Sequence, residues 1–160
     1  MGRTLYLRAT RREQAPADQG FTLIELLVVV VIIGVLIAIA VPLYSNYKKG
    51  AQNTVAASDV RGGISAVEQF YTSNGNLYPD TVAPGTAGAD LTLTLAAATG
   101  PSTGTITVSN GNTLGYTNHT TYYLICGQST SGQTIYFYNS STSKSVSKWT
   151  GTATLAACVA

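Results

Sequence analysis

A single carboxylate, Glu25, lies inside an otherwise uncharged apolar run from Phe21 to Val41. Placing a carboxylate within an apolar span costs about 2.5–3.5 kcal/mol on membrane-insertion scales. The charge is therefore expected either to pair with a cationic group or to reach the headgroups at a membrane surface. Either role is electrostatic, so Glu25 is a candidate for recognition and not for catalysis.

Two cysteines, Cys126 and Cys158, have 31 residues (127–157) between them. In an oxidising compartment two cysteines most simply form one disulfide, and we expect that pairing in preference to two buried free thiols. The loop-entropy argument gives roughly 3–4 kcal/mol of stabilisation for a loop of this size.

Other chemistry-bearing residues form no catalytic pattern, so we expect neither an enzyme nor a cofactor. His119 has no second histidine or free cysteine at ligand spacing, which argues against zinc. Asp80 and Asp90 are two scattered acids, and solvated loop positions explain them better than a calcium site. No metal site is predicted. Asn118-His119-Thr120 and Asn139-Ser140-Ser141 match the glycosylation sequon, which we interpret as chance matches.

Two lysines near the C-terminus raise the question of DNA binding. Lys144 and Lys148 flank a short segment before Trp149, and a basic strip with an aromatic residue can hold single-stranded nucleic acid. An edge strand protected by lysine is the preferred interpretation. Residues 21–160 hold five basic and five acidic residues, so their formal charge is zero and the electrostatic case for nucleic acid is weak.

The first 20 residues are polar and basic, and they are predicted to be a targeting leader. Four arginines against Glu13 and Asp18 give them a charge of +2. The 21 residues from Phe21 to Val41 would form roughly 32 Å of helix, close to the thickness of a bilayer core. The arginines favour a cytoplasmic N-terminus, which places both cysteines outside the cell.

The apolar run continues without a break into an amphipathic stretch, so one helix is predicted from about Phe21 to about Ser73. Pro42 should kink it, and Gly34 should weaken it. Asn74-Gly75-Asn76 is a credible stop. The predicted core-facing stripe has spacings of three to five: Tyr44, Tyr47, Ala51, Val55, Val60, Ile64, Val67 and Tyr71.

Residues 74–160 are predicted to form a head of three to five antiparallel strands packed on the outer half of the long helix. The predicted fold class is therefore α+β, a long kinked helix on a small antiparallel sheet. The expected strands are Thr105–Val108, Tyr122–Cys126 and Thr134–Tyr138, with a weaker one at Lys144–Trp149 and a strand or short helix at Leu91–Leu95.

Two interpretations of the N-terminus compete. An ordinary signal peptide would be cut after Ala38-Ile39-Ala40, so that the mature chain begins at Val41. Alternatively, the segment Gly20–Glu25 (GFTLIE) with its apolar tail resembles the prepilin peptidase site of type IV pilins and pseudopilins. We prefer the second interpretation, because a signal peptide gains nothing from Glu25.

The resemblance implies a set of site residues and the type IV pilin fold. The leader would be cut after Gly20, Phe21 would become the N-methylated N-terminus, and Glu25 would pair with the Phe21 amine of a neighbouring subunit. Gly34 and Pro42 lie where such helices are commonly kinked. The disulfide between Cys126 and Cys158 would bound a variable, solvent-facing loop, Gln128–Ala157.

The resemblance also implies a function: a structural subunit, inserted in the cytoplasmic membrane as a single-pass prepilin and then polymerised into an extracellular filament for motility, adhesion or DNA uptake. The implied partners are further copies of the chain, the prepilin peptidase, the assembly machinery and the membrane. A type II secretion pseudopilin and a minor pilin that binds DNA or a surface stay open as alternatives.

Overall fold

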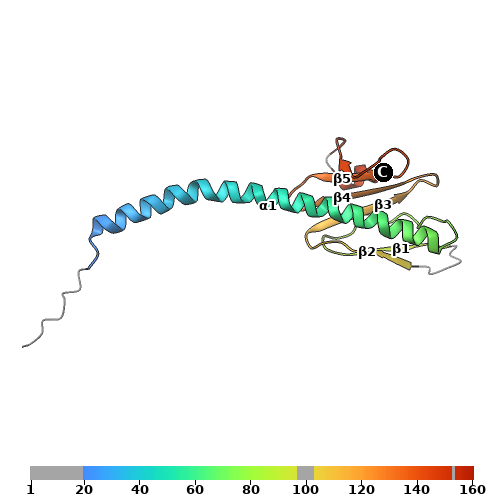
Figure 1. Ribbon diagram of the computed structural model, residues 1–160, viewed down its shortest axis with the longest axis horizontal. Helices are drawn as coiled ribbons and strands as arrows, with labels where there is room; N and C mark the ends of the chain where they lie inside the picture. The colour runs from blue at the N-terminus through green and yellow to red at the C-terminus, as the bar shows by residue number, and fades with distance from the viewer. Residues whose placement is uncertain (1–19, 97–102, 153) are drawn as a thin grey trace, which may run out of the picture. The chain divides into compact units, whose positions relative to one another are not determined.

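The computed structural model describes residues 20–96, 103–152 and 154–160. Of the predicted leader, residues 1–19 lie outside the described residues. The chain divides into two compact units, residues 1–41 and 42–160. Its elements (Figure 1) are α1 (Leu23–Ser73), β1 (Leu91–Thr94), β2 (Thr103–Ile106), β3 (Asn112–Asn118), β4 (Tyr123–Ser129), β5 (Ile135–Asn139), β6 (Ser147–Lys148) and α2 (Leu155–Cys158).

The first unit contains the apolar part of α1. Every residue from Gly20 to Ala51 is exposed, so no part of the described chain covers this apolar surface. Among the described helices, α1 alone is long and apolar enough to cross a membrane. The helix begins two residues after the predicted start and ends at the predicted residue, Ser73.

The second unit packs the C-terminal part of α1 on two antiparallel sheets, which confirms the α+β prediction (Figure 1). One sheet has four strands in the order β3-β4-β5-β6, and the other has two, β1 and β2. The strands predicted around Leu91, Thr105, Tyr122 and Thr134 are present, with shifted ends. The weaker prediction at Lys144–Trp149 corresponds to β6, which has two residues.

The strand β3 is absent from the sequence predictions. Its seven residues, Asn112–Asn118, include Asn at both ends and Gly115 in the middle, and Asn and Gly are depleted in strands. β3 nevertheless pairs with β4 along its whole length. Its other edge is covered by the chain around Val82, which exchanges backbone hydrogen bonds with Tyr116 at 2.9 and 3.0 Å. Pairing on both sides explains why a locally weak segment forms a strand.

The stripe of α1 that faces the sheets differs from the predicted one. The first four predicted residues (Tyr44, Tyr47, Ala51 and Val55) are exposed. The buried residues begin later: Ala56, Ala57, Asp59, Val60, Gly63, Val67 and Phe70. The prediction was wrong for its first half because the head first approaches α1 around Lys49 and Asn53, where the backbone N–H of Thr134 donates to the Asn53 side chain at 3.3 Å.

The head has two apolar clusters on opposite faces of the four-stranded sheet. Successive side chains of a strand point to opposite faces. On β4, Ile125 therefore packs with Val60 and Val67 of α1, in a cluster that also contains Leu93. The next residue, Cys126, belongs instead to a second cluster with Ile135, Leu155, Cys158 and Val159.

Candidate processing and assembly site

The N-terminus of α1 is closed by a reciprocal cap between Thr22 and Glu25. The backbone N–H and the hydroxyl of Thr22 donate to Glu25 Oε2 at 2.8 and 2.7 Å. In return, the backbone N–H of Glu25 donates to Thr22 Oγ1 at 3.3 Å. This is a capping box, which satisfies backbone donors that the first turn of a helix leaves unpaired.

The capping box is a role for Glu25 that the sequence analysis did not predict. The signal was present, because Thr22-Leu23-Ile24-Glu25 matches the pattern of Ser or Thr followed three residues later by Glu, just before an apolar run. The cap fixes where the helix begins. It therefore leaves Gly20 and Phe21 outside α1, in chain without regular secondary structure ahead of the first turn.

The proposed scissile bond is accessible. Gly20 is exposed, and the Phe21 side chain is 87% exposed. A Cβ added at Gly20 would meet no atom within 4 Å. A protease could therefore approach the bond between these two residues without displacing any of the described chain.

The two predicted kink residues lie within α1. Helical structure continues through Gly34 and through Pro42, which is the first residue of the second compact unit. A Cβ at Gly34 would meet nothing within 4 Å, so this glycine is not required by contacts within the described chain. A kink at either position stays a prediction.

The predicted disulfide between Cys126 and Cys158 is present, and both residues are buried. It joins β4 to α2, whose start is capped by Thr154: the backbone N–H of Ala157 donates to Thr154 Oγ1 at 3.2 Å. The Thr117 hydroxyl also donates to the carbonyl of Val159. The C-terminal segment is thus fixed to the face of the sheet opposite α1.

The loop that the disulfide bounds is largely accessible. Within the described part of 128–157, only Ser129, Ile135 and Leu155 are buried. The other described residues are exposed or half-buried. This agrees with the expected solvent-facing segment, whose variability stays a prediction.

The lysine pair lies at the edge of the four-stranded sheet. Lys148 is in β6, which pairs with β5 at the end of the strand order among the described residues, and Lys144 precedes that strand. Trp149 packs edge-on against Phe137 at 5.3 Å between ring centroids, and its indole N–H donates to the Thr152 carbonyl at 3.0 Å. The ring therefore has a packing role in the head, which favours the protected-edge interpretation.

The remaining candidate ligands serve local structure. The His119 ring stacks on Tyr122 with centroids 4.6 Å apart. Asp80 accepts from the backbone N–H of Ala96 at 3.0 Å, and Asp90 accepts from that of Val108 at 2.8 Å. Within residues 20–96, 103–152 and 154–160, no group of three or more His, Cys, Asp or Glu is placed to hold a metal ion.

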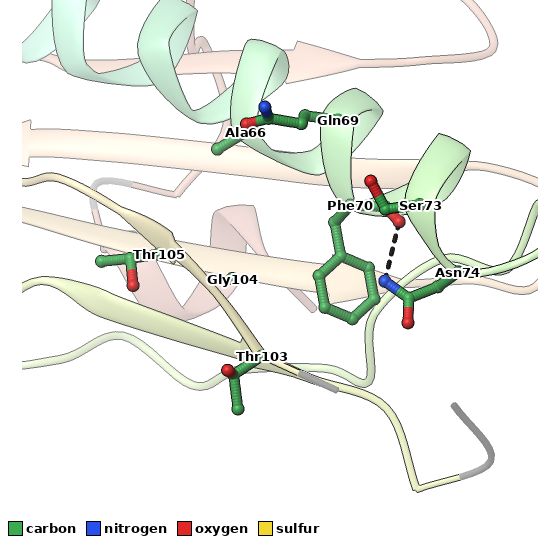
Figure 2. Close-up of a pocket in the computed structure, with 8 residues that line it drawn as sticks. All are labelled: Ala66, Gln69, Phe70, Ser73, Asn74, Thr103, Gly104 and Thr105. Atoms are coloured by element: carbon green, nitrogen blue, oxygen red, sulfur yellow. Dashed lines mark hydrogen bonds between the residues drawn. The ribbon is translucent and has the colours of Figure 1, made fainter. Parts of the chain in front are cut away.

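A small cavity of about 230 Å³ lies between the end of α1 and β2. Figure 2 shows the Phe70 ring pointing from α1 towards β2, beside Asn74, whose amide donates to the Phe70 carbonyl at 2.9 Å. None of the eight described lining residues is ionisable: Ala66, Gln69, Phe70, Ser73, Asn74, Thr103, Gly104 and Thr105. The lining therefore offers no acid, base or charged nucleophile.

Comparison with known proteins identifies the same N-terminal segment of the chain. The family described as the prokaryotic N-terminal methylation motif matches residues 16–41. Over 70 residues the chain is 40% identical to the type IV major pilin protein PilE of Neisseria gonorrhoeae, a match that covers 44% of this chain and 42% of that protein. It is 41% identical over 70 residues to the fimbrial protein EcpC of Eikenella corrodens, which covers 44% of this chain and 46% of the relative.

A third relative, the type IV major alpha-pilin of Moraxella bovis, is 46% identical over 52 residues, 32% of this chain and 33% of that protein. The chain thus covers less than half the length of each of these relatives. No solved structure matches the chain. The chain is therefore similar to type IV pilins in its N-terminal part, which carries the methylation motif, and its α+β architecture is consistent with the fold that this similarity implies.

Proposed function

We propose that this chain is the structural subunit of an extracellular type IV pilus filament. It would be inserted in the cytoplasmic membrane with its N-terminus inside, cut between Gly20 and Phe21, methylated at Phe21 and then polymerised. The observation that carries the proposal is the exposed apolar part of α1, preceded by an accessible Gly20 and carrying one carboxylate at Glu25. The names of the relatives, type IV major pilin and fimbrial protein, support the same role.

The exposed apolar surface of residues 21–41 needs an apolar environment both before and after assembly. A contiguous surface of this kind is not stable in water and marks a membrane or protein contact. Residues 21–41 would lie in the bilayer before assembly and in a bundle of equivalent helices afterwards. Residues 42–73 and the head, 74–160, would stay outside the hydrocarbon core of the membrane, and residues 1–20 would be removed.

Glu25 would provide register between subunits. After cleavage, Phe21 carries a new cationic amine four residues before Glu25. The capping bonds from Thr22 both end on Oε2 of Glu25, so the carboxylate has a second oxygen with which to accept from the Phe21 amine of a neighbouring subunit. In an apolar bundle such a pair contributes specificity, because removing one partner leaves the other charge unpaired.

The proposal assigns the chain no catalytic step. Its partners would be further copies of itself, the prepilin peptidase, the assembly machinery and the membrane. Motility, adhesion and DNA uptake are all compatible with such a filament. The packing of Trp149 against Phe137 gives the DNA-binding alternative no support.

The decisive experiment is the intact mass and N-terminal sequence of the protein isolated from cells. A chain that begins with methylated Phe21 would support the proposal. A chain that begins at Val41 would mean ordinary secretion and would overturn it. Two variants sharpen the test: Gly20→Val should retain the leader, whereas Ala40→Val, at the signal-peptide-like site, should leave processing unchanged.

A further inference from the structure

A short stretch of α1 is left bare between the apolar run and the head. The run ends at Val41, and residues 42–48 are all exposed. The head first reaches the helix at Lys49 and Asn53, where the β4–β5 turn lies so close that a Cβ added at Gly132 would be 3.0 Å from the Lys49 carbonyl oxygen and 2.0 Å from Asn53 Oδ1. We call residues 42–49 the collar.

The collar is slightly longer than a headgroup layer is thick. Its seven exposed residues ahead of Lys49, 42–48, rise about 10 Å along a helix. A bilayer is about 40–45 Å thick with its headgroups and about 30 Å without them, which leaves roughly 5–8 Å on each side. A run that fills the hydrocarbon core, followed by a bare collar, would keep the head just clear of the headgroups.

The residues of the collar suit an interface between water and lipid. Tyr44 and Tyr47 are 71% and 69% exposed, far more than a core-facing tyrosine, and they lie three residues apart on one side of the helix. Tyrosine is enriched at membrane interfaces because its ring is apolar and its hydroxyl is polar. Lys48 lies four residues after Tyr44, on the same side, and Lys49 follows it.

The charge of the collar is uncompensated along the helix. The sequence from Leu26 to Ser58 contains no acidic residue, so Lys48 and Lys49 have no carboxylate within reach on α1. The β4–β5 turn that meets the helix here, residues 130–134, is uncharged as well. Two ammonium groups beside exposed tyrosines match an anionic phosphate surface better than a neutral one.

We propose that the collar binds the phospholipid headgroups on the head side of the membrane and prefers anionic phospholipids there. Tyr44 and Tyr47 would lie at the level of the glycerol backbone, and Lys48 and Lys49 would reach the phosphates. This inference rests on the proposed membrane insertion. It adds to that proposal the class of lipid that the precursor contacts and the depth of the precursor in the membrane before assembly.

The depth test uses the full chain in phosphatidylglycerol–phosphatidylcholine vesicles. The Tyr44→Trp variant, in a Trp149→Phe background, should be quenched most by lipids brominated near the glycerol. The Leu36→Trp variant in the same background should be quenched most by lipids brominated deep in the acyl chains. Two results would overturn the proposed role of the collar. One is tryptophan emission from position 44 that is unquenched and typical of water, and the other is emission quenched most by lipids brominated deep in the acyl chains.

The lipid test compares spin-labelled phosphatidylglycerol with spin-labelled phosphatidylcholine next to the inserted protein. The wild type should restrict more of the anionic lipid, and the preference should fall about fivefold for each lysine removed in Lys48→Gln/Lys49→Gln. The control Lys144→Gln/Lys148→Gln removes the same charge from the head and should keep the preference. Equal restriction of the two lipids by the wild type would overturn the proposed lipid preference. So would an equal loss of the preference in both double variants.

Insertion is measured first, by resistance to alkaline carbonate extraction. A wild-type chain that is extracted would overturn the proposed membrane precursor, and the collar with it. A chain that resists extraction but fails the depth and lipid tests would overturn the collar alone.

Discussion

The Thr22 hydroxyl donates a hydrogen bond to the Glu25 carboxylate across the first turn of α1, with Thr22 Oγ1 2.7 Å from Glu25 Oε2. Glu25 therefore has a local task, which is to cap the helix, and a proposed task, which is to pair with the amine of a neighbouring subunit. The two tasks depend on different properties of the side chain. Capping needs an acceptor at the right place, whereas pairing in an apolar bundle needs the negative charge.

Substitutions can separate these two tasks. Glu25→Gln keeps an acceptor that a capping box tolerates but removes the charge. Thr22→Ala removes the cap, at about 0.5–2 kcal/mol of helix stability, but keeps the charge. We expect Glu25→Gln to reduce sedimentable filaments by about tenfold or more, since an unpaired Phe21 amine in the bundle costs more than 1.4 kcal/mol. Thr22→Ala should assemble within about twofold of the wild type.

Cleavage and membrane insertion serve as controls for this comparison. Both variants should be cut at Gly20 and extracted only by detergent, because neither change alters the apolar run. Filaments of normal yield from Glu25→Gln would contradict the pairing role. Equal losses in the two variants would instead assign Glu25 to capping alone.

The disulfide between Cys126 and Cys158 should stabilise the head. Cys158→Ser opens a loop of 32 residues in sequence separation, for which the loop-entropy argument gives roughly 3–4 kcal/mol. The measurement is urea unfolding of the full chain in detergent, followed by circular dichroism. Reduced wild type should unfold at the same urea concentration as the variant. An unchanged midpoint would contradict a stabilising bridge.

The end of α1 could be predicted because its stop signal is local. Gly75 and Asn76 adopt left-handed backbone conformations, with φ of 67° and 62°, and the Asn76 N–H donates to the Tyr71 carbonyl at 3.0 Å. Glycine and asparagine are the residues that favour this conformation. β3 could not be predicted, because what makes it a strand is its pairing with β4 and with the chain around Val82.

The candidate site likewise combines residues that local sequence predicts with residues that only distant contacts explain. Gly20, Phe21 and Glu25 are recognisable in a contiguous motif, and the two cysteines could pair in only one way. The burial of Asp59 was not predictable, since its partners, Ser109 and Asn112, lie 50 and 53 residues away. In the sequence Asp59 is one polar residue among many on α1, and only the packing of the head distinguishes it.

Asp59 is expected to be the polar residue of α1 that contributes most to head stability. Its carboxylate accepts from the Ser109 N–H at 3.0 Å, the Ser109 hydroxyl at 2.7 Å and the Asn112 amide at 2.6 Å. Asp59→Asn replaces one carboxylate oxygen with an NH₂ group, which would face the donor groups of Ser109 or Asn112 and could not accept from them. We expect a loss of about 2–4 kcal/mol in the free energy of unfolding, measured with urea.

The matched control for this change is Asp80→Asn. Asp80 is exposed and its side chain accepts from the Ala96 N–H at 3.0 Å. The control should cost less than about 1 kcal/mol, as for an exposed hydrogen bond. Equal losses in the two variants would show that the bonds of Asp59 do not hold α1 to the sheet.

Two buried tyrosines should make the head sensitive to alkaline pH. Burial raises the pKa of Tyr123 well above its ordinary value near 10, and the hydrogen bond that its hydroxyl donates to Glu68 at 2.7 Å raises this pKa further. Burial likewise raises the pKa of Tyr116. Well below pH 10 both tyrosines are protonated in the folded and the unfolded chain, so they add no pH dependence there.

Above pH 10 the unfolded chain releases these protons while the folded head keeps them, so stability must fall as pH rises. Each tyrosine contributes a slope of up to about 1.4 kcal/mol per pH unit. We expect Tyr123→Phe to lower stability at pH 8, because Glu68 loses its bond, but to flatten the decline between pH 10 and pH 11 by about that slope. The measurement is urea unfolding at a series of pH values, with Tyr47→Phe, at an exposed tyrosine, as the control. Parallel declines for wild type and Tyr123→Phe would contradict the prediction, because they would mean that Tyr123 ionises equally easily in the folded and the unfolded chain.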